Sequence, residues 1–177
     1  YRGVYFNNNT QNGTIINNTL KGNDELAIFV HTSSSMEVSN NILFNNLHSC
    51  GGISFIFGNN SHIANNNISL TSCAIEVRNS NHTTVASNTL SNNIWTGISV
   101  IYSNDTEIMD NIVSNSQNAA DGIAILDSSN IVIANNALSG NDGYGINIYR
   151  SNNTIVANNN ASLNDAGIRI STSNNNS

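Results

Sequence analysis

The sequence is poor in the residues that interrupt β-ladders or attract anionic partners. Proline is absent from the 177 residues, and only 9% of them are charged. Because proline removes a backbone donor, its absence is typical of uninterrupted hydrogen-bonded strands. The sequence has five basic and eleven acidic residues, which gives a net charge of −6. No basic stripe is therefore available for phosphates, which excludes nucleic acid and anionic membrane surfaces as partners.

Long apolar segments are also missing. No apolar run approaches the length needed to cross a bilayer, so no membrane insertion is expected in this segment. The chain starts at Tyr1 and stops at Ser177, both inside the repeat pattern described below. Solenoids normally end in polar caps, and none is recognisable here. We therefore expect a piece of a longer polypeptide, or a unit that continues end to end into another copy.

One repeated segment fills the chain. Its clearest copy is 122–141, GIAILDSSNIVIANNALSGN, in which apolar residues alternate, a Ser-Ser pair interrupts, and the alternation resumes. Each copy begins with a small residue followed by Ile or Val, and these steps recur every 22 to 25 residues. The steps are Gly3-Val4, Ala27-Ile28, Gly52-Ile53, Ala74-Ile75, Gly97-Ile98, Gly122-Ile123, Gly145-Ile146 and Gly167-Ile168. The pattern within each copy predicts strand, turn, strand, turn, strand.

The period predicts a solenoid, since one coil of β-patterned sequence cannot bury its own apolar side. Three short strands per coil predict an all-β fold, a single-stranded parallel β-helix with about seven coils. Each strand would pair with its equivalent about 4.8 Å away in the next coil, so that like residues stack on like. Residues 1–177 are expected to form one domain.

An asparagine column runs through the repeats. An asparagine follows the Ile of six steps by thirteen residues, and in the first copy it comes one residue late. These residues are Asn18, Asn41, Asn66, Asn88, Asn111, Asn136 and Asn159. A carboxamide donates and accepts, so side chains stacked at strand spacing can bond along the column. Asn also tolerates the left-handed backbone of a tight turn.

The repeat resembles a known family. A small residue before Ile-x-Ile, a Ser-Asn turn and Ile-x-x-Asn-x-Leu-Ser-x-Asn are similar to the repeats of the NosD-like right-handed parallel β-helix family. Members of that family are often archaeal cell-surface proteins, and they are related to pectin-lyase-like carbohydrate enzymes. The resemblance covers essentially the whole chain and implies a right-handed coil. The residues that carry it build the coil, so it says little about activity.

A search of the outward positions reveals no catalytic pair. The residue after each first Ile or Val is Tyr5, Phe29, Ser54, Glu76, Ser99, Ala124, Asn147 or Arg169. Glu76 and Arg169 are four coils apart, about 19 Å, which is too far to flank one glycosidic bond. Glu76 and Arg78 share a strand face and are expected to form a solvated ion pair. Polygalacturonase-type acidic runs and a Gly-x-Ser-x-Gly elbow are missing, so we expect no catalytic activity of the chain's own.

The sequence contains only weak indications of a metal site. Asp121, Asp142 and Asp165 come from the third turns of consecutive coils, where stacked oxygen ligands could hold Ca²⁺. Water-facing turn residues are the alternative interpretation, and no other cofactor is expected. The four histidines (His31, His48, His62, His82) occupy different positions in their coils and lack metal-site spacing. With only Met36 and Met109 as thioethers, the copper handling that the resemblance suggests is not supported.

Cys50 and Cys73 predict a disulfide. They lie three and two residues before Ile53 and Ile75, so they come from consecutive coils with a one-residue offset. One coil step and one strand step place their α-carbons about 6 Å apart, within the range that a disulfide allows. Buried thiols are the alternative. A bridge would accord with an extracellular location.

Two rows of residues suggest surface features. Asn59, Asn81, Asn104 and Asn152 are glycosylation sequons that all lie six residues after the first Ile, on one edge of the rod. Ile56, Phe57, Ile101, Tyr102, Leu126 and Tyr149 form an apolar outward stripe, which either packs into the turns or contacts a partner.

These observations favour a structural or adhesive extracellular rod, a cell-surface or filament component without catalysis. Its expected partners are copies of itself or other surface proteins, with polysaccharide as a further candidate. The alternative is a carbohydrate-binding or carbohydrate-active β-helix, lyase-like or epimerase-like, whose active coils lie outside this segment.

Overall fold

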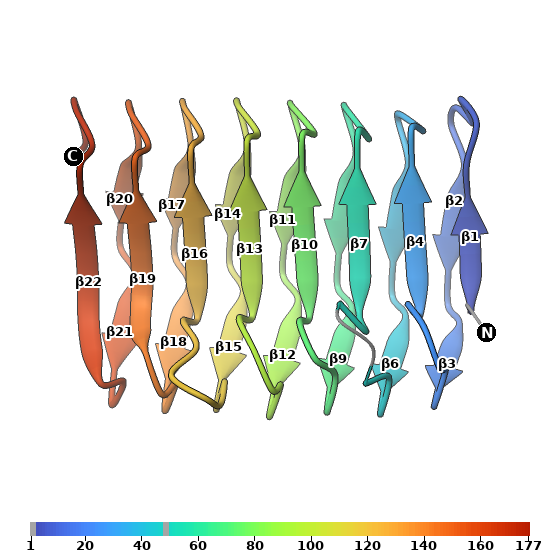
Figure 1. The fold of residues 1–177 in the computed structure, drawn as a ribbon, viewed down its shortest axis with the longest axis horizontal. Helices are drawn as coiled ribbons and strands as arrows, with labels where there is room; N and C mark the ends of the chain where they lie inside the picture. Colours follow the sequence, from blue (N-terminus) through green and yellow to red (C-terminus); the bar gives the residue numbers. More distant parts are fainter. Residues whose placement is uncertain (1–2, 48–49) are drawn as a thin grey trace.

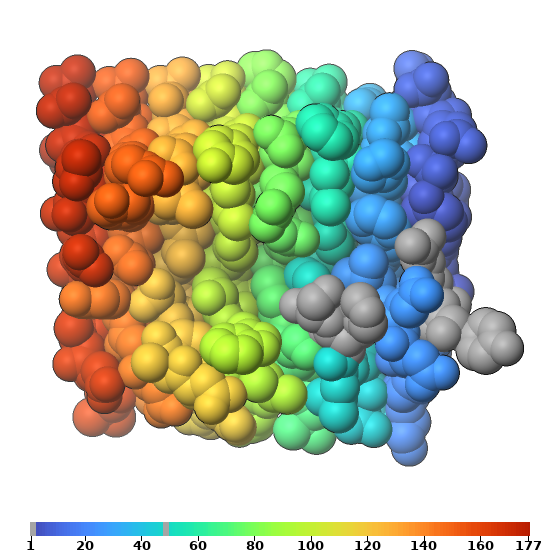
Figure 2. Space-filling view, in the orientation of Figure 1, coloured from blue at the N-terminus to red at the C-terminus, as the bar shows by residue number. Residues whose placement is uncertain are grey.

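The computed structural model describes residues 3–47 and 50–177, and it confirms a parallel β-helix with three strands per coil. Successive coils lie side by side in Figure 1, from the N-terminal end at the right to the C-terminal end at the left. Each coil forms one band of side chains in the space-filling view (Figure 2). The described residues contain no helix long and apolar enough to cross a membrane.

Three parallel sheets run along the rod. The first consists of β1 (Val4–Phe6), β4 (Ile28–His31), β7 (Ile53–Ile56), β10 (Ile75–Arg78), β13 (Ile98–Ile101), β16 (Ile123–Leu126), β19 (Tyr144–Tyr149) and β22 (Ala166–Ser171). The second consists of β2 (Thr14–Ile16), β5 (Glu37–Ser39), β8 (His62–Ala64), β11 (Thr84–Ala86), β14 (Glu107–Met109), β17 (Val132–Ala134) and β20 (Ile155–Ala157). The third consists of β3 (Thr19–Lys21), β6 (Ile42–Phe44), β9 (Asn67–Ser69), β12 (Thr89–Ser91), β15 (Ile112–Ser114), β18 (Ala137–Ser139) and β21 (Asn160–Ser162).

The register stacks equivalent residues of successive coils, as the repeat predicts. In the first sheet Ile75 pairs with Ile98, Ile98 with Ile123, and Ile123 with Ile146. These isoleucines are fully buried and point into the rod, together with one inward residue from each strand of the other two sheets. The core is therefore a set of parallel columns of Ile, Val and Leu that runs along the axis of the rod.

The predicted asparagine ladder is present. From Asn18 to Asn136, each backbone N–H of the column donates to the side-chain oxygen of the asparagine in the next coil, for example Asn88 N to Asn111 Oδ1 at 3.0 Å and Asn111 N to Asn136 Oδ1 at 2.9 Å. The Asn111 side-chain amide also donates to Val85 O and Met109 O. Asn111 is buried, so the ladder satisfies polar groups that water cannot reach.

Two further ladders were not predicted. A second amide ladder occupies the third turn, where Asn23 and Ser116 donate their backbone N–H to Asn46 and Asn141 of the next coils. A serine ladder occupies the first turn, where Ser80 N donates to Ser103 Oγ at 3.0 Å. Each turn of the coil is thus fixed by a column of side chains that bond to the backbone of the neighbouring coil.

Candidate functional site

The outer face of the first sheet is hollowed at its C-terminal end. There β16, β19 and β22 place Ala124, Asn147 and Arg169 side by side in register, with Leu126 beside Tyr149. These residues line a shallow hollow of about 430 Å³. Its floor is apolar and its walls carry an amide and a guanidinium group.

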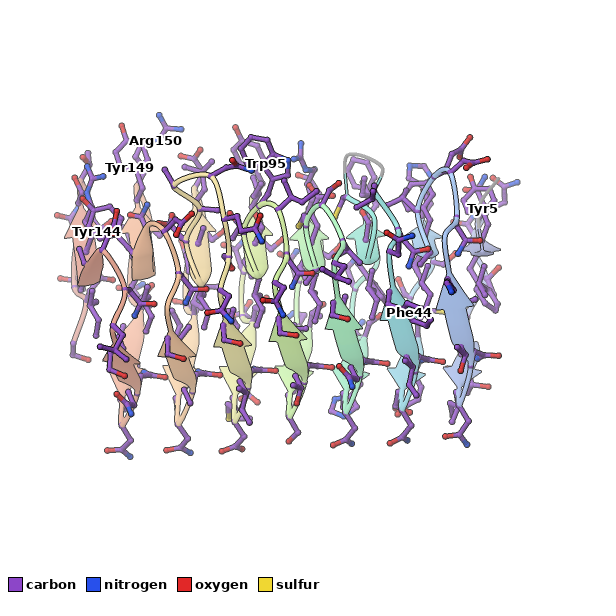
Figure 3. The ribbon with its side chains drawn as sticks, turned by 90° about the horizontal axis from the view of Figure 1, so that it is seen from below. Tyr5, Phe44, Trp95, Tyr144, Tyr149 and Arg150 are labelled. Atoms are coloured by element: carbon purple, nitrogen blue, oxygen red, sulfur yellow. The ribbon has the colours of Figure 1, made fainter. Side chains whose placement is uncertain are left out.

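The strands aim these side chains outward for a simple reason. Ile146 and Ile148 of β19 are fully buried, and alternation along a strand then turns Asn147 and Tyr149 to the opposite face. β19 is six residues long where β16 has four, so it also brings Tyr144 onto this surface. Figure 3 shows Tyr144, Tyr149 and Arg150 together at the C-terminal end of the rod, with Tyr5 at the other end.

A second hollow adjoins the first and shares Asn147 with it. It measures about 470 Å³, and its lining includes Asp121, Asp142, Tyr144 and Asp165. Asp121 positions its neighbours, because its carboxylate accepts the backbone N–H of Tyr144 at 2.8 Å and the Asn147 Nδ2 at 2.9 Å. The Asn147 Oδ1 atom is buried without a hydrogen-bond partner. The two hollows adjoin at Asn147, and together they are called the groove, whose far end carries the three aspartates.

Two guanidinium groups lie against tyrosine rings beside this groove. Arg169 lies over the Tyr144 ring at 5.4 Å, and Arg150 lies over the Tyr149 ring at 4.8 Å. Arg150 also donates to both carboxylate oxygens of Asp127, at 2.7 and 2.6 Å. The hydrogen bond from Arg150 is the largest cause that lowers the pKa of Asp127. Cations and aromatic rings together suit recognition of a polar ligand that has flat apolar faces.

The sequence shows the outward row of the first sheet, but this grouping of its residues was not predicted. Glu76, the acidic residue of that row, lies four strands from Arg169 and binds Arg78 through two hydrogen bonds of 3.0 and 2.8 Å, as expected of an ion pair. Asn147 and Arg169 are neighbours in the same outward row, and the repeat alone could have predicted that they lie side by side. The contribution of Tyr144 was not predicted, because nothing in the sequence indicates that β19 begins one residue before the Gly145-Ile146 step.

The predicted calcium ligands line one hollow. Asp121, Asp142 and Asp165 all border it, but residues 3–47 and 50–177 hold no group of three His, Cys, Asp or Glu side chains able to bind a metal ion. Calcium at these aspartates stays a prediction. His31 ends β4, His62 begins β8 and His82 lies 3.8 Å from Asp105, so these three histidines are separate. His48 lies outside the described residues.

Cys50 and Cys73 lie in adjacent coils, as predicted, and both are thiols. The Cys50 thiol donates to the Cys73 carbonyl oxygen at 3.9 Å, and the Cys73 thiol donates to Ile75 O at 3.6 Å. A hydrogen bond with the Cys73 side chain, followed by burial, raises the pKa of Cys50. The Cys50 thiol thus contacts the backbone of Cys73 in the next coil, and the disulfide stays a prediction.

The predicted glycosylation sites lie in one column. The backbone N–H of Asn81 donates to Asn59 Oδ1, and that of Asn104 donates to Asn81 Oδ1, both at 2.7 Å. Asn152 continues it through bridges to Ser129. Their glycosylation remains a prediction.

The apolar stripe also occupies one outward row. Ile56, Ile101, Leu126 and Tyr149 stack in register and are half-buried, although Arg78 interrupts the row. Phe57 and Tyr102 follow in left-handed turn positions and are 51% and 53% exposed. Partner contact by this stripe stays a prediction.

Comparison with known proteins identifies relatives. The sequence matches the family described as "Periplasmic copper-binding protein (NosD)" over residues 1–122 and 48–177. No curated protein matches the chain.

Several solved structures share the fold. A mutant of the periplasmic alginate epimerase AlgG has a TM-score of 0.76 at 21% identity, over 91% of this chain and 39% of that one. The mannuronan C-5 epimerase AlgE4 A-module of Azotobacter vinelandii has a TM-score of 0.60 at 15% identity, over 97% and 54%. The surface adhesin PfbA of Streptococcus pneumoniae has a TM-score of 0.64 at 15% identity, over 94% and 64%. The chain thus spans less than two thirds of each of these proteins.

These relatives correct one prediction. The expectation that the chain has no catalytic activity of its own is contradicted, because the similar structures include two epimerases and an α-1,3-glucanase catalytic domain. The error has a physical cause. The repeated residues build the coil and are alike in enzymes and rods, whereas chemistry lies in the outward residues, which the repeat does not constrain.

Proposed function

The chain belongs to the family of periplasmic copper-binding proteins (NosD), and from that premise we propose that it is a carbohydrate-active β-helix of the cell envelope that binds polysaccharide in the groove over β16, β19 and β22. The adhesive rod is the less favoured reading, because enzymes that act on polysaccharide are prominent among the similar structures.

One observation carries this proposal: an apolar and aromatic floor lies beside fixed polar groups in a single shallow hollow. Leu126 and Tyr149 offer surface for the faces of a sugar ring, while the second N–H of the Asn147 amide and the Arg169 guanidinium offer hydrogen bonds at its edge. Small-ligand sites combine these elements, a mostly apolar lining with few oriented polar groups. Because Asp121 holds the Asn147 amide at 2.9 Å, that polar group is preoriented before a ligand arrives.

Binding can be tested by electrophoresis through gels that contain alginate or a neutral glucan. We expect either polymer to retard the wild-type protein. Arg169→Ala loses a charged contact and Tyr149→Ala loses stacking surface, so each should raise the apparent Kd about tenfold. Lys21→Ala removes one positive charge from the third sheet, and Ile112→Ala removes an exposed apolar side chain there.

The two control variants should bind like the wild type. If Lys21→Ala and Arg169→Ala weaken binding equally, the binding depends on the net charge of the protein and not on the groove. Absence of retardation by both polymers would overturn the proposal.

A second candidate function, acid–base catalysis on the bound sugar, is favoured by the second hollow. Its aspartates and the Tyr144 phenol are groups that transfer protons, and Arg169 lies beside the phenol ring. Nuclear magnetic resonance of each polymer during incubation with the protein should show new anomeric signals. Asp142→Asn and Asp165→Asn should abolish these signals while the gel retardation persists, and unchanged signals in both variants would exclude these carboxylates.

A further inference from the structure

The first turn of the coil carries large side chains at positions where the backbone favours small ones. Phe57, Tyr102 and Arg150 each follow a strand of the first sheet, and their φ angles are left-handed, at 58°, 51° and 49°. The N–H of each donates to the next coil at 3.1 Å, so the ladder holds the turn in this conformation. Bulky residues rarely adopt it, because Cβ then crowds the following carbonyl oxygen.

The second turn shows which residues this backbone selects when nothing else is required of the side chain. Its left-handed column consists of Asn17, Asn40, Asn65, Ser87, Asp110, Asn135 and Asn158, which are all small and polar. Both columns need the same backbone, so the coil does not explain the large side chains of the first turn. Strained positions of this kind are typical of sites where the side chain has another role. Phe57 and Tyr102 are about half exposed, so that role lies at the surface.

The large side chains recur in every second coil. Phe57 follows β7, Tyr102 follows β13 and Arg150 follows β19, with one small polar residue of the same column in each coil between. Two coil steps separate neighbouring large residues by about 10 Å along the rod. The Arg150 guanidinium lies over the Tyr149 ring at 4.8 Å, so an aromatic ring also marks the third position. Phe57, Tyr102 and Tyr149 are called the ring row, and because Tyr149 lines the groove, the row leads from the groove toward the N-terminal end.

We propose that the ring row extends the groove as a series of stacking positions for one polysaccharide chain that lies along the rod. This extension depends on polysaccharide binding in the groove, the function proposed above, and it specifies the linkage of the polymer. In an extended β-1,4-linked chain each sugar is flipped relative to the one before, so the same ring face recurs at every second residue. Two such residues span about two coil steps, which matches aromatic rings in alternate coils. Aromatic side chains supply the large, flat apolar surface that stacking on these faces needs.

Titration calorimetry with oligosaccharides of two lengths tests the ring row. The probes are β-1,4-linked mannuronate and β-1,4-linked glucose, each as a disaccharide and a hexasaccharide. The hexasaccharide reaches from the groove to Phe57, so for at least one of the two sugars it should bind about a hundredfold tighter than the disaccharide, about tenfold for each added ring. An α-1,4-linked glucose hexasaccharide, whose sugars are not flipped, should show no comparable gain over its disaccharide.

Tyr102→Asn and Phe57→Asn remove the rings and introduce a residue that tolerates the left-handed backbone. Each should weaken hexasaccharide binding about tenfold, leave disaccharide binding unchanged, and keep or raise the melting temperature. Leu70→Asn is the matched control, because Leu70 also has a left-handed φ, of 53°, and is 50% exposed, but it follows β9 in the third sheet. This control should bind both oligosaccharides like the wild type.

A failure of the ring row can be told apart from a failure of the groove. Hexasaccharide binding that Arg169→Ala weakens and both ring variants leave unchanged would retain the groove and overturn the row. Binding of no oligosaccharide would overturn both. Lower melting temperatures with an unchanged dependence on length would mean that the rings serve only the coil. Loss of self-association in Tyr102→Asn during sedimentation, again with unchanged length dependence, would assign the row to a second copy of the chain. Either of these last two results overturns the proposal.

Discussion

The two faces of the first sheet follow opposite rules. Its inward row reads Val4, Ile28, Ile53, Ile75, Ile98, Ile123, Ile146 and Ile168, so isoleucine occupies seven of the eight strands. Its outward row reads Tyr5, Phe29, Ser54, Glu76, Ser99, Ala124, Asn147 and Arg169, which are seven residue types in eight strands, with serine twice. The inward row repeats because each residue must pack on its own copy in the next coil.

The contrast separates stability from recognition. Inside the rod a substitution meets two identical neighbours and leaves a cavity between them, whereas outside it meets solvent on at least one side. The outward row is therefore free to change from coil to coil. Aromatic rings gather at its N-terminal end, where Tyr5 and Phe29 stack at 5.3 Å, and polar and charged groups gather at its C-terminal end. Any specific activity is expected to reside in this varied row.

The largest effect is expected from the core of a single strand. In β16 Ile123 is fully buried and Leu126 points outward, yet truncation to alanine removes the same number of carbon atoms from each. Ile123→Ala should lower the free energy of unfolding by about 2–5 kcal/mol, because its neighbours cannot collapse into the space. Leu126→Ala should cost about 1 kcal/mol or less. Urea denaturation measures both, and equal losses would contradict the inner–outer contrast.

The next largest effect compares a buried asparagine of the ladder with an exposed asparagine. Asn111→Leu breaks the buried ladder on both sides and leaves Val85 O and Asn88 N without these partners, which should cost about 1–3 kcal/mol. Asn115→Ala removes an exposed side-chain hydrogen bond of 3.3 Å to Asn92 and places alanine at a left-handed φ of 56°, so it should cost less, about 1 kcal/mol at most. Matching melting shifts for these variants would show that the ladder contributes nothing.

A substitution in the outward row of the first sheet should change stability less, but it should also weaken polysaccharide binding. Asn147→Ala loses a hydrogen bond to Asp121 at the surface, so its free energy of unfolding should fall by about 1 kcal/mol at most. Polysaccharide retardation should nevertheless weaken about fivefold, since one edge contact is lost. Asn111 would then stabilise the fold from the buried ladder, whereas Asn147, the same residue type, would bind the ligand from the outward row. Unchanged retardation would remove Asn147 from the site.

The smallest effect is the pH dependence of the exposed Asp127–Arg150 pair. The hydrogen bond from Arg150 lowers the pKa of Asp127, so the stabilisation is present above the unfolded pKa of about 3.9. It is lost as the pH falls through the lower folded pKa. The melting temperature of the wild type should slightly exceed that of Asp127→Asn at neutral pH, and the gap should close below about pH 4. A gap that persists in stronger acid would mean that the carboxylate charge is not its source.

The sequence alone determined the coil. The 22- to 25-residue spacing, the paired inward Ile positions and the asparagines thirteen residues later predict three strands, their register and the first ladder, because stacking forces equivalent residues to be alike. The second amide ladder was predictable by the same logic. Asn46, Asn93, Asn141 and Asn164 each follow the first Ile of their coil by eighteen residues, but Thr71 and Ser116 interrupt that column and hid it.

Tertiary structure alone decided the groove and the contact of the Cys50 thiol. The groove needs the longer β19, which brings Tyr144 beside Arg169, and it needs Asp121 to turn back onto the next coil and hold Asn147. These contacts join residues 23 to 26 positions apart that share no repeated identity, so periodicity carries no information about them. Whether the Cys50 thiol reaches Cys73 depended on side-chain direction within a turn of variable length. A repeat specifies the positions that must match, and the outward positions differ because nothing in the stack requires them to match.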